Sequence, residues 1–398
     1  MTIKDKLLPC LLVIPFASQW ILPDGMESKL YVNILGLPIY IFNLCYIVYI
    51  WKYGGVNIPR VNYKNNNIYV YIKILLFCFI LYEMLVAWTA DQIGFIYKLL
   101  GNNMMVFAAI VYFLCPTNSA TLDKTKYVII PTAIIIALEV ILFGLGILHY
   151  ELDLGDQEFG GIIRINTTVG AATGTAVTLI FCGVLVASFY DLSSWLKWTL
   201  IGLITVSIFF TISRGSILVW CAFLCYIMYK EYFINVGLTK KIKYILLAVA
   251  SILLLGHYGV FDPVIERQDV LSYSGDIDTG RGELKNKAIS ALENSEYIGI
   301  GWGETMCDKG LRDIKMNQPI GVHSYYYCLL AEVGVPGLLI FVFLLLIILL
   351  NLNYQLPLSV YVILLLLLTF STEPIFTYGE FIFPAFFIIS CSLKKYEE

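Results

Sequence analysis

Long apolar runs recur along the whole chain, and they constrain its fold more than any other feature. A transmembrane helix needs about 20 consecutive apolar residues, and a backbone in lipid must satisfy its own hydrogen bonds, which favours helices. The predicted spans are 7–22, 30–51, 68–88, 95–114, 127–148, 169–189, 195–212, 216–234, 242–260, 324–350, 356–371 and 375–392. The sequence therefore predicts an all-α, polytopic membrane protein with about twelve transmembrane helices.

The composition agrees with this prediction and argues against several other classes of protein. Charged residues make up 14% of the chain, whereas soluble domains carry about 25%. The formal net charge of −3 gives no bulk attraction to nucleic acid. Most of the ten cysteines lie inside apolar runs, and no C-x-x-C pair occurs, so we expect neither a disulfide framework nor a zinc site. The first apolar run lacks a convincing cleavage site and is expected to remain as the first helix.

The distribution of lysine and arginine predicts the orientation of the chain. One set of connecting segments, which includes both termini, holds most of these residues, and the opposite short loops hold few. Cytoplasmic loops are enriched in lysine and arginine. Both termini are therefore predicted to be cytoplasmic, in agreement with an even number of spans.

Two longer segments on the predicted outer side interrupt the pattern of short connections. Residues 149–168 form a smaller polar and acidic loop, and residues 261–323 form a large loop with aromatic and periodic apolar positions. Loops of this length are functional or disordered, and its composition favours a folded loop. We predict one integral membrane domain, residues 1–398, into which both periplasmic loops are inserted.

A helix is predicted inside the large loop. Asp278 or Thr279 can cap it, and it should run to about Asn294. The residues that share one stripe of this helix are Arg281, Leu284, Ala288, Ala291 and Leu292. A glycine-rich run, residues 297–303, follows and is expected to allow sharp turns and close backbone approach.

Three arginines on the predicted outer side are candidates for binding a phosphorylated ligand. Arg214 lies in a very short turn between two apolar spans, Arg164 precedes a helix of small residues, and Arg281 opens the predicted loop helix. Arginine at membrane level faces a cavity or a partner rather than lipid, and its planar fork suits bidentate contact with phosphate. The alternative for each is interfacial snorkelling or an ion pair with the acidic residues of 149–168.

The segment where the large loop re-enters the membrane holds a candidate catalytic base. His323 precedes the span 324–350, and an imidazole can take a proton from a sugar hydroxyl near neutral pH. The alternative is a helix-start histidine with a local hydrogen bond. Glu332, further along, should face protein or a cavity, and a structural hydrogen bond is the favoured role for it. Tyr326 is a further candidate supporting residue.

Two motifs are discounted as binding sites. Asp276 and Asp278 have the D-x-D spacing of metal sites that bind nucleotide sugars, but they lie on the predicted outer side, where nucleotide sugars are absent, so turn or capping roles are favoured. The glycines at 299, 301 and 303 do not match the dinucleotide fingerprint. No metal and no cofactor is predicted.

Taken together, these elements resemble the O-antigen ligase and polymerase superfamily. The elements that carry the resemblance occur in the family's order. They are Arg164 before a small-residue helix, Ser213–Arg214, Gly280–Arg281, the glycine run, and the segment 323–337, which contains His323, Glu332 and the motif Val-Gly-Val-Pro-Gly. The resemblance covers roughly residues 160–345. It implies a metal-independent, inverting glycosyltransferase of the bacterial inner membrane, with its active site facing the periplasm.

The resemblance also implies the substrates and the roles of the site residues. Undecaprenyl-diphosphate-linked oligosaccharides would be the donors, Arg164, Arg214 and Arg281 would hold the pyrophosphate, and His323 would activate the acceptor hydroxyl. Partners would be these lipids, the bilayer and, as a further candidate, a polysaccharide chain-length regulator.

Two departures from the family pattern bear on which of the family's activities the protein has. Ser324 stands where asparagine usually follows the histidine, and the second nearby histidine of many ligases is missing. Both favour a Wzy-type polymerase, which joins repeat units of O-antigen or capsule, over a WaaL-type ligase, which moves finished polymer to lipid A-core. A non-enzymatic lipid-linked glycan transporter is a third alternative, although the ionisable residues gather at one face.

Overall fold

The computed structural model describes a predominantly helical chain that divides into two compact units. The described residues are 31–34, 37–40, 66–89, 123–148, 172–233, 281–301, 312–313, 318–319, 324–369, 388–389 and 392–393. One unit combines Met1–Ile129 with Gly280–Glu398, and the other is Ile130–Thr279. We call them the terminal unit and the central unit, and each is described by itself.

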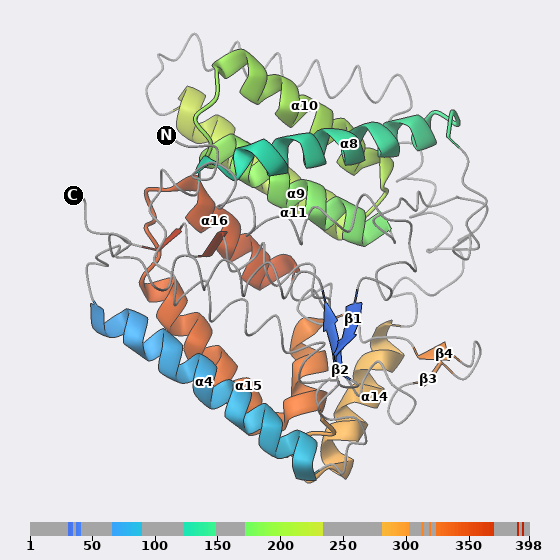
Figure 1. Ribbon diagram of the computed structural model, residues 1–398, viewed down its shortest axis with the longest axis vertical. Coiled ribbons are helices and arrows are strands. Elements are labelled where there is room, and N and C mark those ends of the chain that lie inside the picture. Colours follow the sequence, from blue (N-terminus) through green and yellow to red (C-terminus); the bar gives the residue numbers. More distant parts are fainter. Residues whose placement is uncertain are drawn as a thin grey trace. The chain divides into compact units, whose positions relative to one another are not determined.

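The central unit is a set of helices around α9. Its described elements are α8 (Lys126–Gly144, which begins in the terminal unit), α9 (Ala172–Ser188), α10 (Ser194–Phe210), α11 (Arg214–Met228) and the π-helix η2 (Tyr229–Phe233). Nearly every residue of α9 is buried, whereas α10 and α11 each bury one face. An apolar helix that is buried all round lies at the centre of its unit, so α9 is the core of this one (Figure 1).

Small residues and hydroxyl groups hold the helices of the central unit together. Gly183 of α9 lies directly against the indole ring of Trp220 on α11, where a Cβ atom would leave too little room. The Trp220 Nε1 donates to Thr205 Oγ1 on α10 at 3.0 Å, and the Ser207 hydroxyl donates to the Ala137 carbonyl oxygen on α8 at 3.0 Å. This use of small residues for close approach and of hydroxyl bonds between helices is typical of membrane helix packing.

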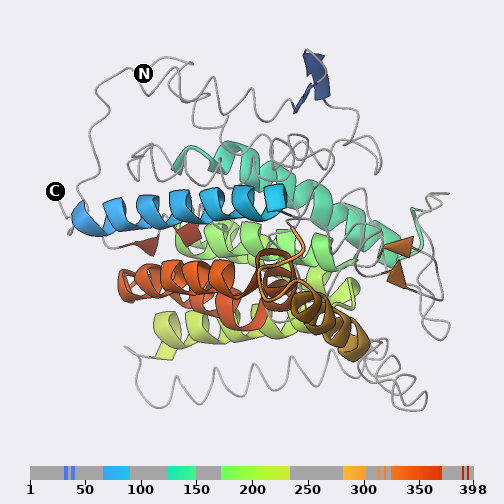
Figure 2. The same cartoon turned by 90° about the horizontal axis from the view of Figure 1, so that it is seen from below.

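The terminal unit contains the two longest described helices. Those two are α4 (Asn66–Thr89) and α15 (Tyr325–Leu350), and the unit also contains α14 (Arg281–Asn294), α16 (Pro357–Leu364) and the π-helix η4 (Leu365–Thr369). Figures 1 and 2 both show α4 alongside α15, and the two helices pack extensively. Phe79 of α4 stacks against Phe341 at 6.0 Å between ring centroids, and Tyr82 lies against Gly337. Since residue 79 meets 341 and residue 82 meets 337, the two helices run antiparallel.

Helix α15 is broken near its middle into two arms. Gly334 has φ 64° and ψ −170°, outside the helical region, and Pro336 follows within the same turn. The ring centroids of Tyr325 and Phe341 are 5.4 Å apart, although a straight helix would separate these positions by about 24 Å. The first arm, residues 325–333, therefore folds back toward the second arm, residues 335–350. The proline and the glycine explain the break, because neither favours a continuous helix.

Helices α4, α8 and α15 carry apolar side chains on their exposed faces and a glutamate inside. On α4, large apolar residues such as Phe77 (59% exposed) and Leu85 (57%) face outward, whereas Glu83 is 1% exposed. Glu139 of α8 and Glu332 of α15 are buried as well. Within the described part of the chain, two helices, α8 and α15, are long and apolar enough to cross a membrane by length and composition. This arrangement is the reverse of that in a soluble protein, and it agrees with a helical membrane protein, in which ionisable residues face the interior.

Seven predicted spans correspond to described helices. The pairs are 68–88 with α4, 127–148 with α8, 169–189 with α9, 195–212 with α10, 216–234 with α11 and η2, 324–350 with α15, and 356–371 with α16 and η4. The spans 7–22, 95–114 and 242–260, and nearly all of 375–392, lie outside the described residues. The count of twelve, the single membrane domain and the side on which 149–168 and 261–323 lie stay predictions.

The prediction of helix throughout was wrong in one place inside a predicted span. Strands β1 (Tyr31–Ile34) and β2 (Leu37–Tyr40) pair antiparallel where the sequence predicted the start of the span 30–51. Ile34 pairs with Leu37, which leaves a two-residue connection that includes Gly36. Glycine and the nearby Pro38 disfavour a helix interior, and this explains the difference. A second short pair, β3 (Arg312–Asp313) with β4 (Gln318–Pro319), lies in the large loop.

Candidate functional site

The break in α15 is filled by the segment that follows α14. The Ile300 amide donates to the Ala331 carbonyl oxygen and the Gly301 amide to the Glu332 carbonyl oxygen, both at 2.9 Å. In the other direction, the Val335 amide donates to the Tyr297 carbonyl oxygen at 3.1 Å. A helix break removes the usual partners of nearby backbone groups, and a buried backbone group needs a replacement. We call this pairing of residues 297–301 with 331–335 the junction.

Glycines make the junction sterically possible. Gly299 has φ 109° and Gly334 has φ 64°, values that L residues rarely adopt. A Cβ atom on Gly299 would collide with the Glu332 carbonyl oxygen, and one on Gly334 would collide with the backbone of Tyr297 and Ile298. The predicted role of this glycine run in close backbone approach is thus confirmed for Gly299, while Gly303 lies outside the described residues.

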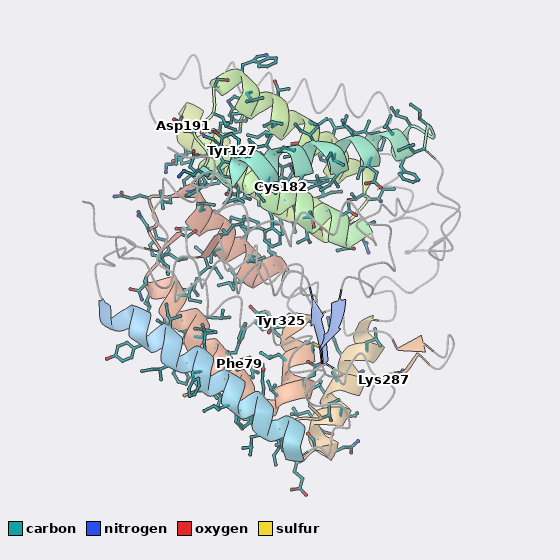
Figure 3. All side chains as sticks on the ribbon, in the orientation of Figure 1. Phe79, Tyr127, Cys182, Asp191, Lys287 and Tyr325 are labelled. Carbon is teal, nitrogen blue, oxygen red and sulfur yellow. The ribbon has the colours of Figure 1, made fainter. Side chains whose placement is uncertain are left out.

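Helix α14 packs beside the first arm of α15, and both helices run in the same direction. Ala288 of α14 forms a buried cluster with Cys328 and Ala331 of the first arm. Beyond the end of α14, the Ile300 amide donates to the Ala331 carbonyl oxygen. The Nζ of Lys285 lies 5.8 Å from the centroid of the Tyr327 ring, near the beginning of both helices. The first residues of α14 and α15 therefore lie at the same end of the pair; Figure 3 labels Lys287 on α14 and Tyr325 at the start of α15.

The helix predicted inside the large loop is confirmed in its extent and in its buried face. Its last residue is Asn294, as predicted, and Leu284, Ala288 and Leu292 are buried. Asp276, Asp278 and Thr279 lie outside the described residues. The stripe is apolar because it packs against the first arm of α15.

The predicted site residues are described to different degrees. Arg281 is the first residue of α14, but its side chain lies outside what the structure describes. Arg164 and His323 lie outside the described residues. Glu332 is 1% exposed, in agreement with the expectation that it faces protein. The Tyr326 hydroxyl donates to the Leu366 carbonyl oxygen of η4 at 2.5 Å. That bond ties the first arm to η4.

A second acidic residue lies near Glu332. Glu83 of α4 is 1% exposed, and neither of its carboxylate oxygens has a hydrogen-bond partner within the part of the chain that the structure describes. The carboxyl groups of Glu83 and Glu332 lie within electrostatic range of each other, and Tyr325 interacts with both. The sequence signal for Glu83 was its position inside an apolar run, but nothing in the sequence indicated its partner.

Arg214 lies in the central unit, at the predicted short turn. Helix α10 ends at Phe210 and α11 begins at Arg214, so residues 211–213 form the whole connection. Within it, Ile212 has φ 53°, an outlier for a β-branched residue. The Thr211 hydroxyl donates to the Ile208 carbonyl oxygen at 2.7 Å and also accepts the Ser213 amide at 3.4 Å. These bonds hold the strained turn that precedes the arginine.

The start of α11 combines two sources of positive potential. Arg214 is half-buried in the first turn, and no acidic residue stands in that turn. A helix N-terminus is itself positive and presents free amide groups, so the arginine adds to the positive potential there. The Ser213 hydroxyl bonds the Ser216 hydroxyl at 2.9 Å, which fixes the entry to the helix. This arrangement suits a phosphate or diphosphate group.

Comparison with protein families identifies the part of the chain that carries these features. Residues 198–342 match a family model described as O-Antigen ligase. No curated protein matches the chain. The matched segment includes Arg214, Arg281, His323 and Glu332, whereas Arg164 precedes it. The predicted resemblance to the O-antigen ligase and polymerase superfamily is confirmed, over somewhat fewer residues than the 160–345 of the prediction.

Proposed function

Proceeding from the similarity of residues 198–342 to the O-antigen ligase family, we propose that the protein is an inverting, metal-independent glycosyltransferase of the bacterial inner membrane. It polymerises undecaprenyl-diphosphate-linked repeat units into a surface polysaccharide at the periplasmic face. About twelve transmembrane helices, with both termini cytoplasmic, enclose the site. A chain-length regulator is the expected protein partner.

In the proposed reaction, one bond to the anomeric carbon of the donor replaces another. His323 takes the proton of the acceptor hydroxyl, whose oxygen attacks this carbon from the side opposite the diphosphate. The bond between the anomeric carbon and the diphosphate oxygen breaks, and its electron pair stays on that oxygen. Arg164, Arg214 and Arg281 stabilise the negative charge of the departing diphosphate.

The observation that carries the proposal is the parallel packing of α14 against the first arm of α15. Arg281 is the first residue of α14, and His323 precedes the first residue of α15 by two positions. Since both helices begin at the same end of the pair, the packing supports a site in which residues 281 and 323 act on one substrate. The junction fixes the other end and so sets the register between the two helices.

The start of α11 supports the proposed role of Arg214. An arginine in the first turn of α11, a turn that contains no acidic residue, adds to the positive end of the helix. A lipid diphosphate supplies the negative charge that such a helix start favours. The strain at Ile212 has the same implication, because strained backbone is concentrated at functional sites.

The O-antigen ligase activity is the second candidate, and the description of the matching family favours it. Ser324 in place of asparagine, and the missing second histidine, favour the polymerase. A lipopolysaccharide gel from a strain that lacks this gene separates them. Lipid A-core with a single repeat unit would identify the polymerase, because ligation continues. Bare lipid A-core, with polymer accumulating on undecaprenyl diphosphate, would identify the ligase, and an unchanged gel would exclude both activities for O-antigen.

Substitutions test the assignment of the site. His323→Ala and Arg281→Ala should each abolish polymer assembly in the complemented strain, and Arg281→Lys should fail as well, because lysine offers a point charge and no fork. Lys285→Ala is the matched control: it removes a positive charge from the same helix and should retain most of the activity. Full activity of His323→Ala and Arg281→Ala at matched protein levels would contradict this assignment.

A further inference from the structure

The first turn of α15 presents three consecutive tyrosines, and each contacts a different part of the terminal unit. They are residues 325–327, and they follow Ser324 directly. Successive side chains of an α-helix point about 100° apart, so the three tyrosines leave the helix in three directions. Contacts in three directions fix the position of a helix start more firmly than contacts on one face.

Tyr325 and Tyr327 make their contacts through the aromatic rings. The ring of Tyr325 lies edge-on to that of Phe341 on the second arm, with 5.4 Å between centroids and 68° between planes. The ring of Tyr327 lies 5.8 Å from the Nζ of Lys285 on α14. Ring pairs are favourable over a wide range of centroid distances, about 4.5–7 Å, so ring contacts alone allow the helix start to shift.

Tyr326 makes a directional contact instead. Its hydroxyl donates to the carbonyl oxygen of Leu366 at 2.5 Å. Leu366 is 2% exposed and belongs to the π-helix η4, and π-helical segments are frequent at functional sites. Because a hydrogen bond weakens steeply as its distance and angle change, this bond holds the first arm in one position against η4.

The residue that precedes the helix does not fix its start. Ser324 is extended, with φ −168° and ψ 121°, and within the described residues its side chain makes no capping bond to the first turn. A backbone bond from the Cys328 amide to the Ser324 carbonyl oxygen, at 3.0 Å, ties it to the helix. The position of Ser324 therefore depends on the helix that follows, and the tyrosines of the first turn set where that helix begins.

A shift of this helix start would move the proposed base. His323 is joined to Ser324 by one peptide bond and precedes Tyr326 by three positions. A general base must lie within hydrogen-bond reach of the proton that it takes. A displacement of about 1 Å at a reacting group can cost about 100-fold in rate, so small movements of the first arm matter for catalysis.

We propose that Tyr326 is a positioning residue for the glycosyl transfer: its hydroxyl bond to the Leu366 carbonyl oxygen holds the start of α15 where His323 meets the acceptor hydroxyl. Tyr326 takes no proton and touches no reacting atom in this role. The proposal rests on the proposed function, in which His323 is the base. It adds η4 to the elements that define the site.

The direction of the bond favours positioning over a direct role in the reaction. A tyrosine hydroxyl has a single proton to donate, and that of Tyr326 is directed at the Leu366 carbonyl oxygen. This proton is therefore engaged by the protein rather than offered to a substrate.

Tyr354 gives a matched control beyond the other end of α15. Its hydroxyl donates to the carbonyl oxygen of Leu349 at 2.5 Å, a bond of the same kind and length. Tyr326→Phe and Tyr354→Phe each remove one hydroxyl and keep the ring. A comparison of the two separates the position of this particular bond from the general loss of a tyrosine bond.

Nitrogen NMR on the full-length protein in lipid nanodiscs tests the positioning without a substrate. The chain has three histidines, His149, His257 and His323, so labelling histidine with nitrogen-15 gives few signals, and His323→Ala identifies those of residue 323. Tyr326→Phe should shift the His323 signals and leave the others, and Tyr354→Phe should leave all of them. Unmoved His323 signals in Tyr326→Phe would overturn the proposal.

Initial rates of polymer formation test the consequence for catalysis. The probe is the lipid-linked repeat unit extracted from the deletion strain, supplied to the purified protein in liposomes. Tyr326→Phe should lower kcat about tenfold or more and change KM little, because a displaced base affects the chemical step, and Tyr354→Phe should match the wild type. A raised KM with an unchanged kcat would overturn the proposal, since Tyr326 would then contribute to binding. Full activity of His323→Ala would contradict the proposed function, whereas the NMR comparison reports on Tyr326 in either case.

Discussion

The junction of the terminal unit and the α10–α11 turn of the central unit are built differently. The junction follows α14, which begins with Arg281, and the turn directly precedes Arg214. The junction brings two backbones into contact, and it relies on Gly299 and Gly334 at positive φ. The turn reverses the chain within residues 211–213 without a glycine, and places Ile212 at positive φ. Close contact between backbones excludes every side chain, whereas a turn without such a contact can keep a strained residue if hydrogen bonds hold it.

The largest effect is expected from adding a single methyl group at the junction. Gly334→Ala introduces a Cβ that collides with the backbone of Tyr297 and Ile298, at a φ that alanine disfavours. It should lower the free energy of unfolding by about 3 kcal/mol and abolish polymer assembly. Thermal unfolding in detergent and a lipopolysaccharide gel measure the two effects.

The control for this substitution is a glycine without a steric role. Gly202 of α10 has open space where its Cβ would lie, so Gly202→Ala should be neutral or should stabilise the helix by up to about 1 kcal/mol. If Gly334→Ala were as mild as Gly202→Ala, the junction would not depend on close backbone contact.

The turn in the central unit should distinguish glycine from alanine in the opposite sense. Ile212→Ala and Ile212→Gly both remove a buried side chain, at a cost of about 2–5 kcal/mol, but only glycine relieves the positive φ, which costs an L residue about 1–2 kcal/mol. Ile212→Gly should therefore melt at a higher temperature than Ile212→Ala. If the strain serves to present Arg214, polymer assembly should be several-fold lower in Ile212→Gly than in Ile212→Ala.

The control is the same pair of substitutions at Val206, on the exposed face of α10, where glycine should be less stable than alanine by about 1 kcal/mol. A lower melting temperature for Ile212→Gly than for Ile212→Ala would mean that the backbone at residue 212 is not strained.

The smallest effect is expected from the hydroxyl group that links α4 to the junction. Tyr82→Phe removes the bond to the Ile298 carbonyl oxygen and should cost about 0.5–1 kcal/mol. Tyr71→Phe changes an exposed tyrosine on the same helix and should be silent. Thermal unfolding of the two variants side by side checks this, and identical melting curves would leave the junction held by its backbone bonds alone.

The site shows where reasoning from the sequence succeeds and where it ends. The helix that ends at Asn294, the short turn before Arg214 and the backbone approach of Gly299 were all predicted, because each follows from a local pattern of spacing or residue type. The fold-back of α15 was not predicted, since its apolar run is long enough for one straight span and the break depends on contacts with the segment after α14. The partner of Glu83 lies about 250 residues away in the sequence, and only packing could bring the two together.

The sequence by itself determined that the chain forms apolar helices, because their length and lack of charge leave lipid as their natural solvent. It also determined which residues would be costly there, such as Glu83 and Glu332, since an ionisable group in an apolar run must face inward. The tertiary structure alone decided the surroundings of these groups: which other side chains lie near each carboxyl group, and which backbone amides satisfy the carbonyl groups freed at Gly334. The reason is physical, because periodicity fixes the face on which a side chain lies, whereas its partner depends on how separate helices pack.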